Sequence, residues 1–320
     1  MQHAIEDLII PVDGSDHAEA AVRYAVRLSK ATGAELHLAH AFPGSIQALM
    51  ERLGTQPRHA STERMTAEAF EALRNGSARR ALERARQQLE PGQTASEHVL
   101  DGEPATAISG FTGDGPGVQV IMGRRGLGRV RELLLGSVSE RVIHRLPGPV
   151  TVVTAGHDGG EANDGRPEPL VVPVDSSSAA CRAAAHAAFV AGCTGARVHL
   201  VHAFPSSPQE VPLLSGDLGG SADVGPFAED AFAQLGENSA REAFDTARDA
   251  MADTGATDLD VVEVRQRGQP AQAVLDYLRE LGPAEIIIGR RGLGRMQELL
   301  VGSVSQKLIH GARCPVTVIG

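Results

Sequence analysis

Tryptophan is absent from this chain of 320 amino acids, and lysine, tyrosine and cysteine are scarce. Its three cysteines, Cys181, Cys193 and Cys314, are too few and too far apart for a disulfide framework or a zinc site, so we expect a reduced, cytoplasmic setting. Tryptophan is absent and tyrosine occurs twice, which leaves few rings for stacking against nucleic-acid bases. Because lysine occurs only at Lys30 and Lys307, arginine or backbone amides would have to supply any contact to a phosphate.

Long apolar runs are missing as well. No apolar stretch reaches the roughly 18 residues that a membrane-spanning helix needs, and the first residues show no pattern of a secretory signal. We therefore expect no association with a membrane. The net charge of −10 disfavours nonspecific binding to nucleic acid, because such binding depends on positive charge. Hydrophobic residues make up 42% of the chain, a composition typical of globular domains, and the length suggests about two of them.

The chain contains two copies of one unit. Residues 9–13 and residues 38–43 both recur, with conservative changes, 162 positions later. A gap-free alignment of residues 123–154 with residues 289–320, at an offset of 166, gives 20 identities in 32 positions. A period of this length is far too long for a solenoid repeat and indicates a duplicated domain. The change in offset places a four-residue insertion after the second strand of the unit.

The duplication predicts the domain boundaries. We assign residues 1–154 to the first domain and residues 169–320 to the second. Residues 155–168 between them are polar and rich in glycine and proline, as is typical of a linker.

Within each copy, short apolar segments alternate with segments of helical period. In the first copy these patterns predict strands at 8–12, 36–41, 95–100, 118–122 and 150–153, helices beginning near residues 16, 63, 104 and 137, and a loop at 43–62. The second copy repeats this pattern, with a longer Gly/Ser-rich excursion at 204–234. Short, fully apolar strands joined by helices favour a parallel sheet that is covered on both faces.

Ligands of open α/β sheets bind beyond the carboxyl ends of the strands, and a glycine-rich loop follows the fourth strand. It contains Gly123, Gly126 and Gly136, and then Ser137 opens a helix. Glycines let the backbone amides approach an anion, and a helix N-terminus favours a phosphate. Arg124 and Arg125 would add positive charge. A chain with 36 glycines can match a loose glycine pattern by chance, but the position between a strand and a helix favours a phosphate site.

The loop differs from two other phosphate-binding patterns. It has no Gly-Lys-Ser/Thr sequence, which excludes a Walker-type loop, and no Gly-x-Gly-x-x-Gly sequence, which disfavours a dinucleotide site.

These motifs resemble those of the universal stress protein family in its tandem, ATP-binding form. The family motif Gly-x2-Gly-x9-Gly-Ser/Thr is complete in both copies, beginning at Gly123 and at Gly289. A first strand that ends in aspartate and a last strand that begins with Pro-Val are also present twice. The resemblance covers both halves nearly end to end. It implies two Rossmann-like α/β/α domains, each with a five-stranded, mainly parallel sheet in the order 3-2-1-4-5 and helices on both faces.

The resemblance also implies one ATP per domain, two per chain, with Mg²⁺ held mainly by the phosphates. The ribose would contact Asp13 and Gly123, the adenine would contact the backbone at Ala41, and the phosphates would lie on the loop and the following helix. The residues predicted in the first domain are Pro11, Asp13, Ala41, Gly123, Arg124, Arg125, Gly126, Gly136, Ser137, Val138 and Ser139. Those predicted in the second are Pro173, Asp175, Ala203, Gly289, Arg290, Arg291, Gly292, Gly302, Ser303, Val304 and Ser305.

The second copy departs from the first at one point of this set. Asp-Gly-Ser at residues 13–15 becomes Asp-Ser-Ser at residues 175–177, and serine takes a turn position less freely than glycine. His40 and His202, next to the predicted adenine position, are interpreted as hydrogen-bonded core residues rather than as catalytic bases.

Three functions compete: a nucleotide-binding regulator of the stress response, a slow ATPase or nucleotide-dependent phosphotransfer enzyme, and an interaction module that has lost its nucleotide. Complete motifs in both copies disfavour the third. For the second, Glu132 and its counterpart Glu298 are the carboxylates within the loops that could orient a water. We predict no catalytic residue and at most slow hydrolysis. We further expect the last strands, at 150–153 and 316–319, to pair in antiparallel fashion as an intrachain pseudo-dimer, because edge strands need cover. A further homodimer and the identity of any regulatory partner stay open.

Overall fold

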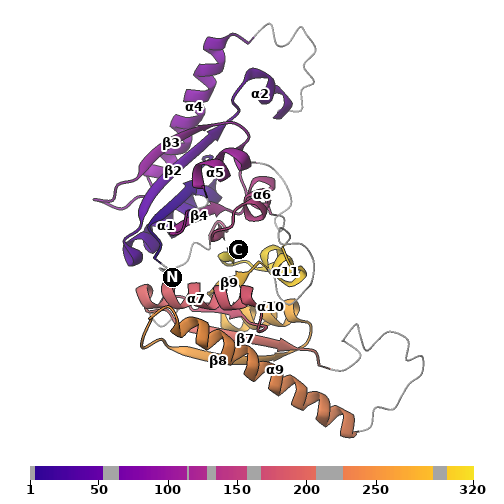
Figure 1. Cartoon of the computed structure of the whole chain (residues 1–320). Helices are drawn as coiled ribbons and strands as arrows, with labels where there is room; N and C mark the ends of the chain where they lie inside the picture. The colour runs from indigo at the N-terminus through magenta and orange to yellow at the C-terminus, as the bar shows by residue number, and fades with distance from the viewer. Residues whose placement is uncertain are drawn as a thin grey trace, which may run out of the picture. The chain divides into compact units, whose positions relative to one another are not determined.

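The computed structural model describes residues 4–52, 65–113, 115–127, 135–156, 167–206, 226–290 and 301–320, without the side chains of 226–229. The chain divides into two compact units, an N-terminal one of Ala4–Asp158 and a C-terminal one that holds Gly159–Gly320. They are called the N-terminal and the C-terminal domain below, and each carries one copy of the duplicated unit (Figure 1). Most of the predicted linker, residues 157–166, lies outside the described residues.

The N-terminal domain is a parallel sheet between two layers of helices. Its strands lie in the order β3-β2-β1-β4-β5, and the pairs are parallel. Helix α1 contacts α4, and α5 contacts α6, which places two helices on each face. The elements are β1 (Asp7–Pro11), α1 (Asp16–Thr32), β2 (Glu35–Phe42), α2 (Ile46–Arg52), α4 (Ala67–Arg86), β3 (Ser96–Asp101), α5 (Pro104–Thr112), β4 (Val118–Gly123), α6 (Ser137–Arg145) and β5 (Val150–Val153).

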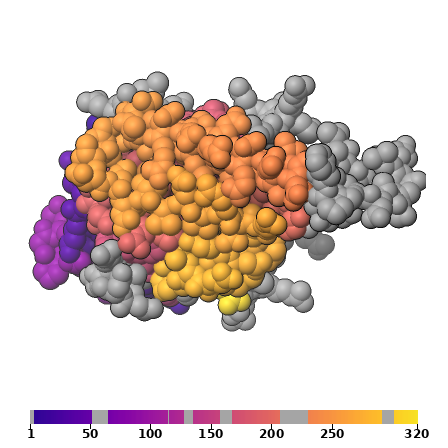
Figure 2. Space-filling view, turned by 90° about the horizontal axis from the view of Figure 1, so that it is seen from below, coloured from indigo at the N-terminus to yellow at the C-terminus, as the bar shows by residue number. Residues whose placement is uncertain are grey.

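The C-terminal domain repeats this topology. Its strands lie in the order β8-β7-β6-β9-β10, again in parallel pairs. Helix α7 contacts α9, and α10 contacts α11. The later residues of this domain, coloured orange and yellow, form most of the surface seen in Figure 2. The elements are β6 (Leu170–Pro173), α7 (Ser178–Thr194), β7 (Val198–Phe204), α9 (Pro226–Ala252), β8 (Val261–Arg267), α10 (Pro270–Leu281), β9 (Glu285–Gly289), α11 (Ser303–Gly311) and β10 (Val316–Ile319).

The predicted fold class is confirmed: both domains are Rossmann-like, with mainly parallel sheets and helices on both faces. One local prediction is wrong. The segment 43–62 was expected to be a loop, but residues 46–52 form the short helix α2. Its seven residues make about two turns, too few for a helical period to be recognised in the sequence. Within the described part of the chain, no helix is both long and apolar enough to cross a membrane.

Local signals in the sequence set the ends of the first helix in each domain. The hydroxyl of Ser15 accepts from the Ala18 amide at 3.2 Å and caps α1, and Gly33 ends the helix at φ 79°. Ser177 and Gly195 do the same for α7. The strands between the helix layers carry fully buried aliphatic side chains, which form the core of each domain.

The two copies share contacts as well as sequence. His40 bonds the Val12 carbonyl through Nδ1, at 2.7 Å, and the Ser77 hydroxyl through Nε2, at 3.0 Å. The same ring nitrogens of His202 lie 2.8 Å from the Val174 carbonyl and 3.2 Å from Ser239. Both rings are buried, so the interpretation as hydrogen-bonded core histidines is confirmed. In each domain this histidine ties the first two strands to the long helix.

These contacts locate the four-residue insertion. Ser77 and Ser239 are still 162 positions apart, as are the aromatic pairs Phe42–Phe70 and Phe204–Phe232. In the next strand Glu97 pairs with Leu38, and Glu263 pairs with Leu200, an offset of 166. The extra residues therefore lie between the middle of α9 and β8. The excursions before the long helices are thus equal in length, so the prediction of a longer excursion in the second copy is wrong.

The first helix of each domain packs directly on the last residue of the fourth strand. A Cβ placed on Gly123 would lie 2.7 Å from the backbone carbon of His17, in α1. A Cβ on Gly289 would lie 2.5 Å from the backbone carbon of Ala179, in α7. Real Cβ contacts are longer, so only glycine allows this close approach of helix and strand.

We predict that Gly123→Ala destabilises the N-terminal domain by roughly 1–3 kcal/mol, because the added methyl group must push α1 away from β4. Gly110→Ala is the control, since Gly110 lies exposed in α5 with nothing near its Cβ position, and alanine there should be neutral or stabilise by up to about 1 kcal/mol. The free energy of unfolding of both variants is measured by urea denaturation, followed by tyrosine fluorescence in a Tyr277→Phe background. The tyrosine that remains there, Tyr24, lies in the N-terminal domain. Equal stability of the two alanine variants would contradict the packing argument.

Candidate functional site

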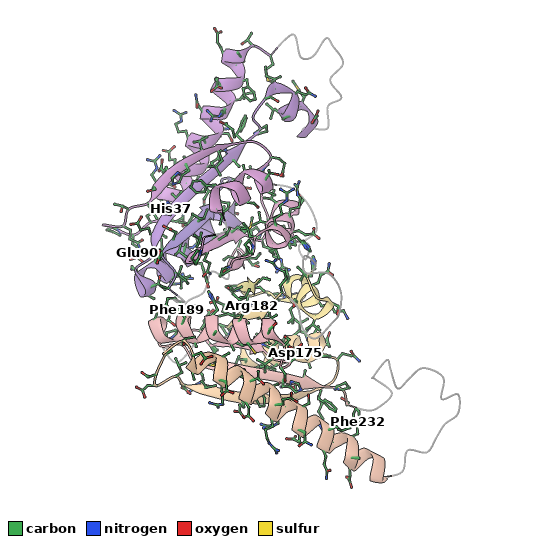
Figure 3. All side chains as sticks on the ribbon, in the orientation of Figure 1. His37, Glu90, Asp175, Arg182, Phe189 and Phe232 are labelled. Atoms are coloured by element: carbon green, nitrogen blue, oxygen red, sulfur yellow. The ribbon has the colours of Figure 1, made fainter. Side chains whose placement is uncertain are left out.

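The carboxyl end of the sheet is where the predicted site residues meet. In the N-terminal domain β1 lies between β2 and β4, so the chain order reverses between β1 and β4. Asp13 follows β1 and the glycine loop follows β4, which places both at this switch point. In the C-terminal domain β6 lies between β7 and β9, Asp175 follows β6 (Figure 3), and Gly289 ends β9, as Gly123 ends β4.

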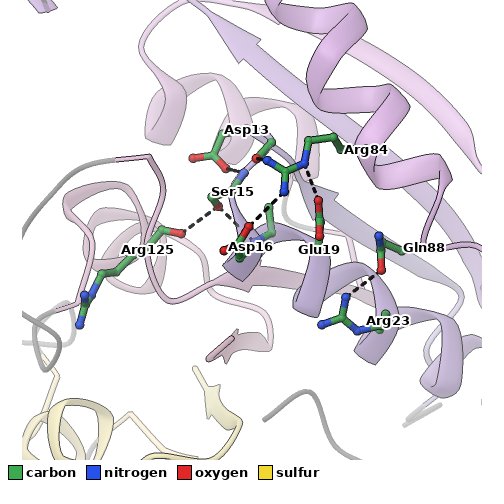
Figure 4. A network of polar contacts seen from close by, with 10 residues as sticks. Asp13, Ser15, Asp16, Glu19, Arg23, Arg84, Gln88 and Arg125 are labelled. Atoms are coloured by element: carbon green, nitrogen blue, oxygen red, sulfur yellow. Dashed lines mark hydrogen bonds and ion pairs between the residues drawn. The ribbon is translucent and has the colours of Figure 1, made fainter. Parts of the chain in front are cut away.

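Asp13 lies against the start of the glycine loop. Its Oδ1 accepts a hydrogen bond from the Ser15 amide at 2.9 Å, which holds the turn after β1. A Cβ on Gly126 would collide with its Oδ2, so the carboxylate is packed against the loop backbone. The Ser15 hydroxyl donates to the Arg125 carbonyl at 3.3 Å and connects the two segments (Figure 4). The structure therefore places the first-strand aspartate next to the start of the glycine loop.

Helix α6 begins beside this aspartate with an open N-terminus. Its N-cap is Gly136, which has no side chain to cap the helix, and the Gly136 amide donates to the Arg124 carbonyl at 2.8 Å. The first backbone N–H groups of a helix have no partner within the helix. Ser137 is exposed and Val138 half-exposed, so the first turn faces solvent. This arrangement suits an anion.

The side chains of Ser139 and Arg124 lie buried in the domain rather than on the exposed surface of the loop. The Ser139 side chain is buried, and its hydroxyl donates to the Gly123 carbonyl at 2.9 Å, which fixes the start of the loop to α6. The Arg124 side chain is buried as well, whereas Arg125 is half-exposed. Of the loop residues predicted to contact ATP, the described ones with exposed surface are thus Arg125, Gly126, Gly136, Ser137 and Val138.

Arginine charges lie near the start of the glycine loop in each domain. Burial lowers the pKa of His17, and the positive charges of Arg125 and then Arg124 lower it further. The Nδ1 atom of His17 accepts from the Ala155 amide at 2.9 Å, as an unprotonated ring nitrogen does. In the C-terminal domain, burial and the nearby charge of Arg182 lower the pKa of Arg290.

The C-terminal domain reproduces the described parts of the site. The Asp175 Oδ1 accepts from the Ser177 amide at 3.2 Å and from its hydroxyl at 2.5 Å. The Gly302 amide donates to the Arg290 carbonyl at 2.7 Å, and the Ser305 hydroxyl donates to the Gly289 carbonyl at 2.8 Å. Ser303 and Val304 open α11 as their counterparts open α6. Arg291 and Gly292 lie outside the described residues, as do Glu132 and Glu298.

The predicted adenine positions lie at the ends of the second strands. Ala41 and Ala203 are each the penultimate residue of their strand, β2 and β7, and both are half-exposed. Pro11 and Pro173 end the neighbouring strands β1 and β6. Each alanine is therefore on the same edge of the sheet as the aspartate and the glycine loop.

The turn after the first strand differs between the domains as the sequence suggested. Gly14 has φ 81°, and Ser176 at the same place has φ 60°. The backbone thus keeps its left-handed conformation although a serine must adopt it, which costs energy that glycine avoids. The second site retains its turn with some strain.

Sequence reasoning missed an ionic brace in the N-terminal domain, shown in Figure 4. Arg84 of α4 donates to the Gly14 carbonyl, contacts Asp16 at 3.0 Å and donates to Glu19 at 2.5 Å. The hydrogen bond to Glu19, together with the contact to Asp16, raises the pKa of Arg84 above its ordinary value. The brace fastens the turn that carries Asp13 to the long helix.

The C-terminal domain has no such group of charges at the matching positions. Ser178, Cys181 and Thr246 stand where the N-terminal domain has Asp16, Glu19 and Arg84. The Cys181 sulfur lies 4.0 Å from the Thr246 carbonyl. An alignment of the two copies at offset 162 could have revealed this difference from the sequence.

Fold and site together define a tandem pair of Rossmann-like α/β domains, each with an aspartate and a glycine loop at its switch point. Residues 5–154 and 167–320 each match the model of the universal stress protein family. The chain belongs to this family.

Individual relatives agree with that assignment. A universal stress protein of Mycolicibacterium smegmatis is 26% identical over 324 residues, which cover 98% of this chain and 96% of that protein. A universal stress protein of Thermus aquaticus is 33% identical over 150 residues, 47% of this chain and 96% of its own length. The crystal structure of a universal stress protein from Archaeoglobus fulgidus, 21% identical, covers 98% of this chain and 97% of its own with a TM-score of 0.56, and supports the fold.

We predict that Ser176→Gly stabilises the C-terminal domain by about 0.5–1 kcal/mol, because relief of the left-handed strain outweighs the added freedom of the unfolded chain. Gly14→Ser is the matched exchange in the other domain and should destabilise it by about 1 kcal/mol. Denaturant unfolding with one tyrosine kept per experiment, Tyr277 or Tyr24, reports each domain separately. A loss of stability in Ser176→Gly would show that its side chain makes a favourable contact instead.

Proposed function

We propose that each domain binds one ATP and that the chain is a nucleotide-binding regulatory protein of the stress response. The observation that carries this proposal is the helix N-terminus without a side-chain cap, α6 or α11, beside an aspartate at the switch point. Open amides and a nearby carboxylate are what a phosphate and a ribose require. The C-terminal copy also has a helix N-terminus without a side-chain cap, at α11, and an aspartate after its first strand, Asp175.

ATP would lie across the carboxyl end of the sheet. Its phosphates would accept hydrogen bonds from the amides around Gly126, Gly136 and Ser137, and the Asp13 carboxylate would accept from a ribose hydroxyl. The adenine would lie against the backbone at Ala41. A Cβ at Gly136 would lie 3.1 Å from the Arg124 carbonyl oxygen, closer than most real Cβ contacts, so this position leaves little room for a side chain. Mg²⁺, where present, would be held mainly by the phosphates and would neutralise their charge.

The contacts of two nearby groups support retention rather than turnover of ATP. Hydrolysis needs a group that positions and activates a water. The Ser139 hydroxyl is engaged by the Gly123 carbonyl, and His40 is engaged on both ring nitrogens. Slow hydrolysis through Glu132 and Glu298 is the alternative.

The antiparallel pairing of residues 150–153 with 316–319 and any homodimer stay predictions, and the regulatory partner is left open.

Titration calorimetry with ATP and Mg²⁺ on nucleotide-free protein should give a stoichiometry near two. Gly136→Val and Gly302→Val should each reduce it to one, and the double variant should bind none, because the valine side chain blocks the approach of a phosphate to the amides. Asp13→Asn should weaken the first site about tenfold to hundredfold, since it removes a charged hydrogen-bond acceptor.

The two valine variants serve as controls for each other, because each leaves one domain unchanged. Circular dichroism of both should match the original chain. Full binding at both sites in the double variant would refute the phosphate assignment, and no binding to the original chain would refute the proposal itself.

Steady-state phosphate release should be slow, below roughly 1 s⁻¹, the lower end of typical kinase turnover. The measurement is repeated with Glu132→Gln combined with Glu298→Gln. Faster turnover that is lost in this double variant would make the chain an ATPase and assign its catalytic residues.

A further inference from the structure

A second cluster of polar side chains lies at the opposite, amino end of the N-terminal sheet. Asp7 begins β1, and Glu35 begins β2 directly beside it, because these two residues are paired in the parallel ladder. His37 follows two residues after Glu35 and therefore shares its face of the sheet. Asp7 precedes Asp13 by six residues, or about 20 Å of extended strand, so this cluster is separate from the ATP site.

The three side chains converge on one point. One ligand atom from each of Asp7, Glu35 and His37 can be chosen so that all three lie within 4.8 Å of one another. The His37 Nε2 is 2.9 Å from the Asp7 Oδ1. Atoms that share a zinc ion lie about 3.4 Å apart, given metal–ligand distances near 2.1 Å. Glu35 is exposed and can swing toward the other two, so only small movements separate the present arrangement from coordination.

A fourth residue lies behind the histidine. The His37 Nδ1 is 3.2 Å from the Nε2 of His98, on β3, and the His98 ring packs against Phe111 at 4.6 Å. A histidine that binds a metal through one nitrogen usually donates from the other to an acceptor, which orients the ring. His98 provides such an acceptor, and Phe111 of α5 limits its movement.

An ion pair between His37 and Asp7 alone would not account for the whole cluster. It would need one carboxylate, yet two carboxylates stand side by side on neighbouring strands, where their negative charges repel each other. A cation between them would remove that repulsion. The side chains of His37 and Asp7 are 17% and 39% exposed, so an ion can reach the cluster from solvent.

We propose that Asp7, Glu35 and His37 form a binding site for a divalent transition-metal ion, with Zn²⁺ as its best match, and that His98 orients the histidine ligand (Figure 3 labels His37). One imidazole nitrogen and two carboxylate oxygens are zinc ligands, and three protein ligands leave a fourth position open for water. The nitrogen ligand disfavours Mg²⁺, which prefers oxygen.

The C-terminal domain provides an internal control. It keeps the histidine as His199 but has Pro169 and Arg197 in place of the two carboxylates. Arg197 pairs with Asp260 at 2.7 Å, and the His199 Nδ1 lies 2.5 Å from the Tyr277 hydroxyl. The proposal therefore predicts one ion per chain, not two.

The test is equilibrium dialysis of the full chain against Zn²⁺, with metal quantified by mass spectrometry. We expect one tightly held Zn²⁺ per chain that is not displaced by millimolar Mg²⁺. Glu35→Gln and His37→Ala should weaken binding more than about tenfold, and His98→Ala by about 10–100-fold. His199→Ala should leave the stoichiometry and affinity unchanged.

Two further measurements keep the result unambiguous. Because Glu35 is exposed, Glu35→Gln should fold normally, and Zn²⁺ should raise the melting temperature of the original chain but not of this variant. The double variant Gly136→Val with Gly302→Val should still bind Zn²⁺, which separates this site from ATP binding. Equal zinc affinity in Glu35→Gln and the original chain, or no zinc bound at micromolar concentration, would overturn the proposal.

Discussion

The close contact between the first helix and the last residue of the fourth strand is the constraint on which both candidate sites depend. With Gly123 against α1 and Gly289 against α7, helix and strand approach more closely than any side chain would permit. That approach brings the turn after the first strand next to the loop after the fourth. Asp13 can then lie against Gly126, and the amides of α6 can face the same space. A larger residue at either glycine would separate the two halves of the site.

Some of the contacts around this helix–strand contact are the same in both domains, and others differ between them. Two buried contacts are shared: the histidine that ties two strands to the long helix, and the serine hydroxyl that bonds the carbonyl at the start of the loop. The exposed ones have diverged. The Arg84 brace, the glycine at position 14 and the Asp7–Glu35–His37 cluster are found in the N-terminal copy and are replaced at the matching positions of the other. Core contacts tolerate little change in volume, whereas exposed charges contribute little to stability and change readily.

Under the proposal that each domain binds one nucleotide, this divergence has a functional consequence. Two sites of the same design, one braced by charges and one with a strained serine turn, need not bind their ligand equally well. A regulatory protein with unequal sites responds over a wider range of ligand concentration than one with identical sites.

The sequence by itself determined the duplication, the fold class and the segments that meet at the switch point. Strand and helix alternation is a local pattern, and parallel strands joined by right-handed crossovers leave few arrangements. Asp13, Gly123 and Gly136 could therefore be placed at one edge without a structure. The short helix α2 was missed because seven residues carry too little periodicity.

Only the tertiary structure decided which side chains touch. Nothing in the spacing of Arg84 and Asp16, or of Asp7 and His37, indicates that these residues meet, because the contacts join elements far apart in the chain. The structure also showed that Ser139 supports the loop from beneath, whereas the pattern had grouped it with the residues that face the ligand. Sequence periodicity specifies the face of an element, but the register between elements and the reach of each side chain are set when the elements pack together.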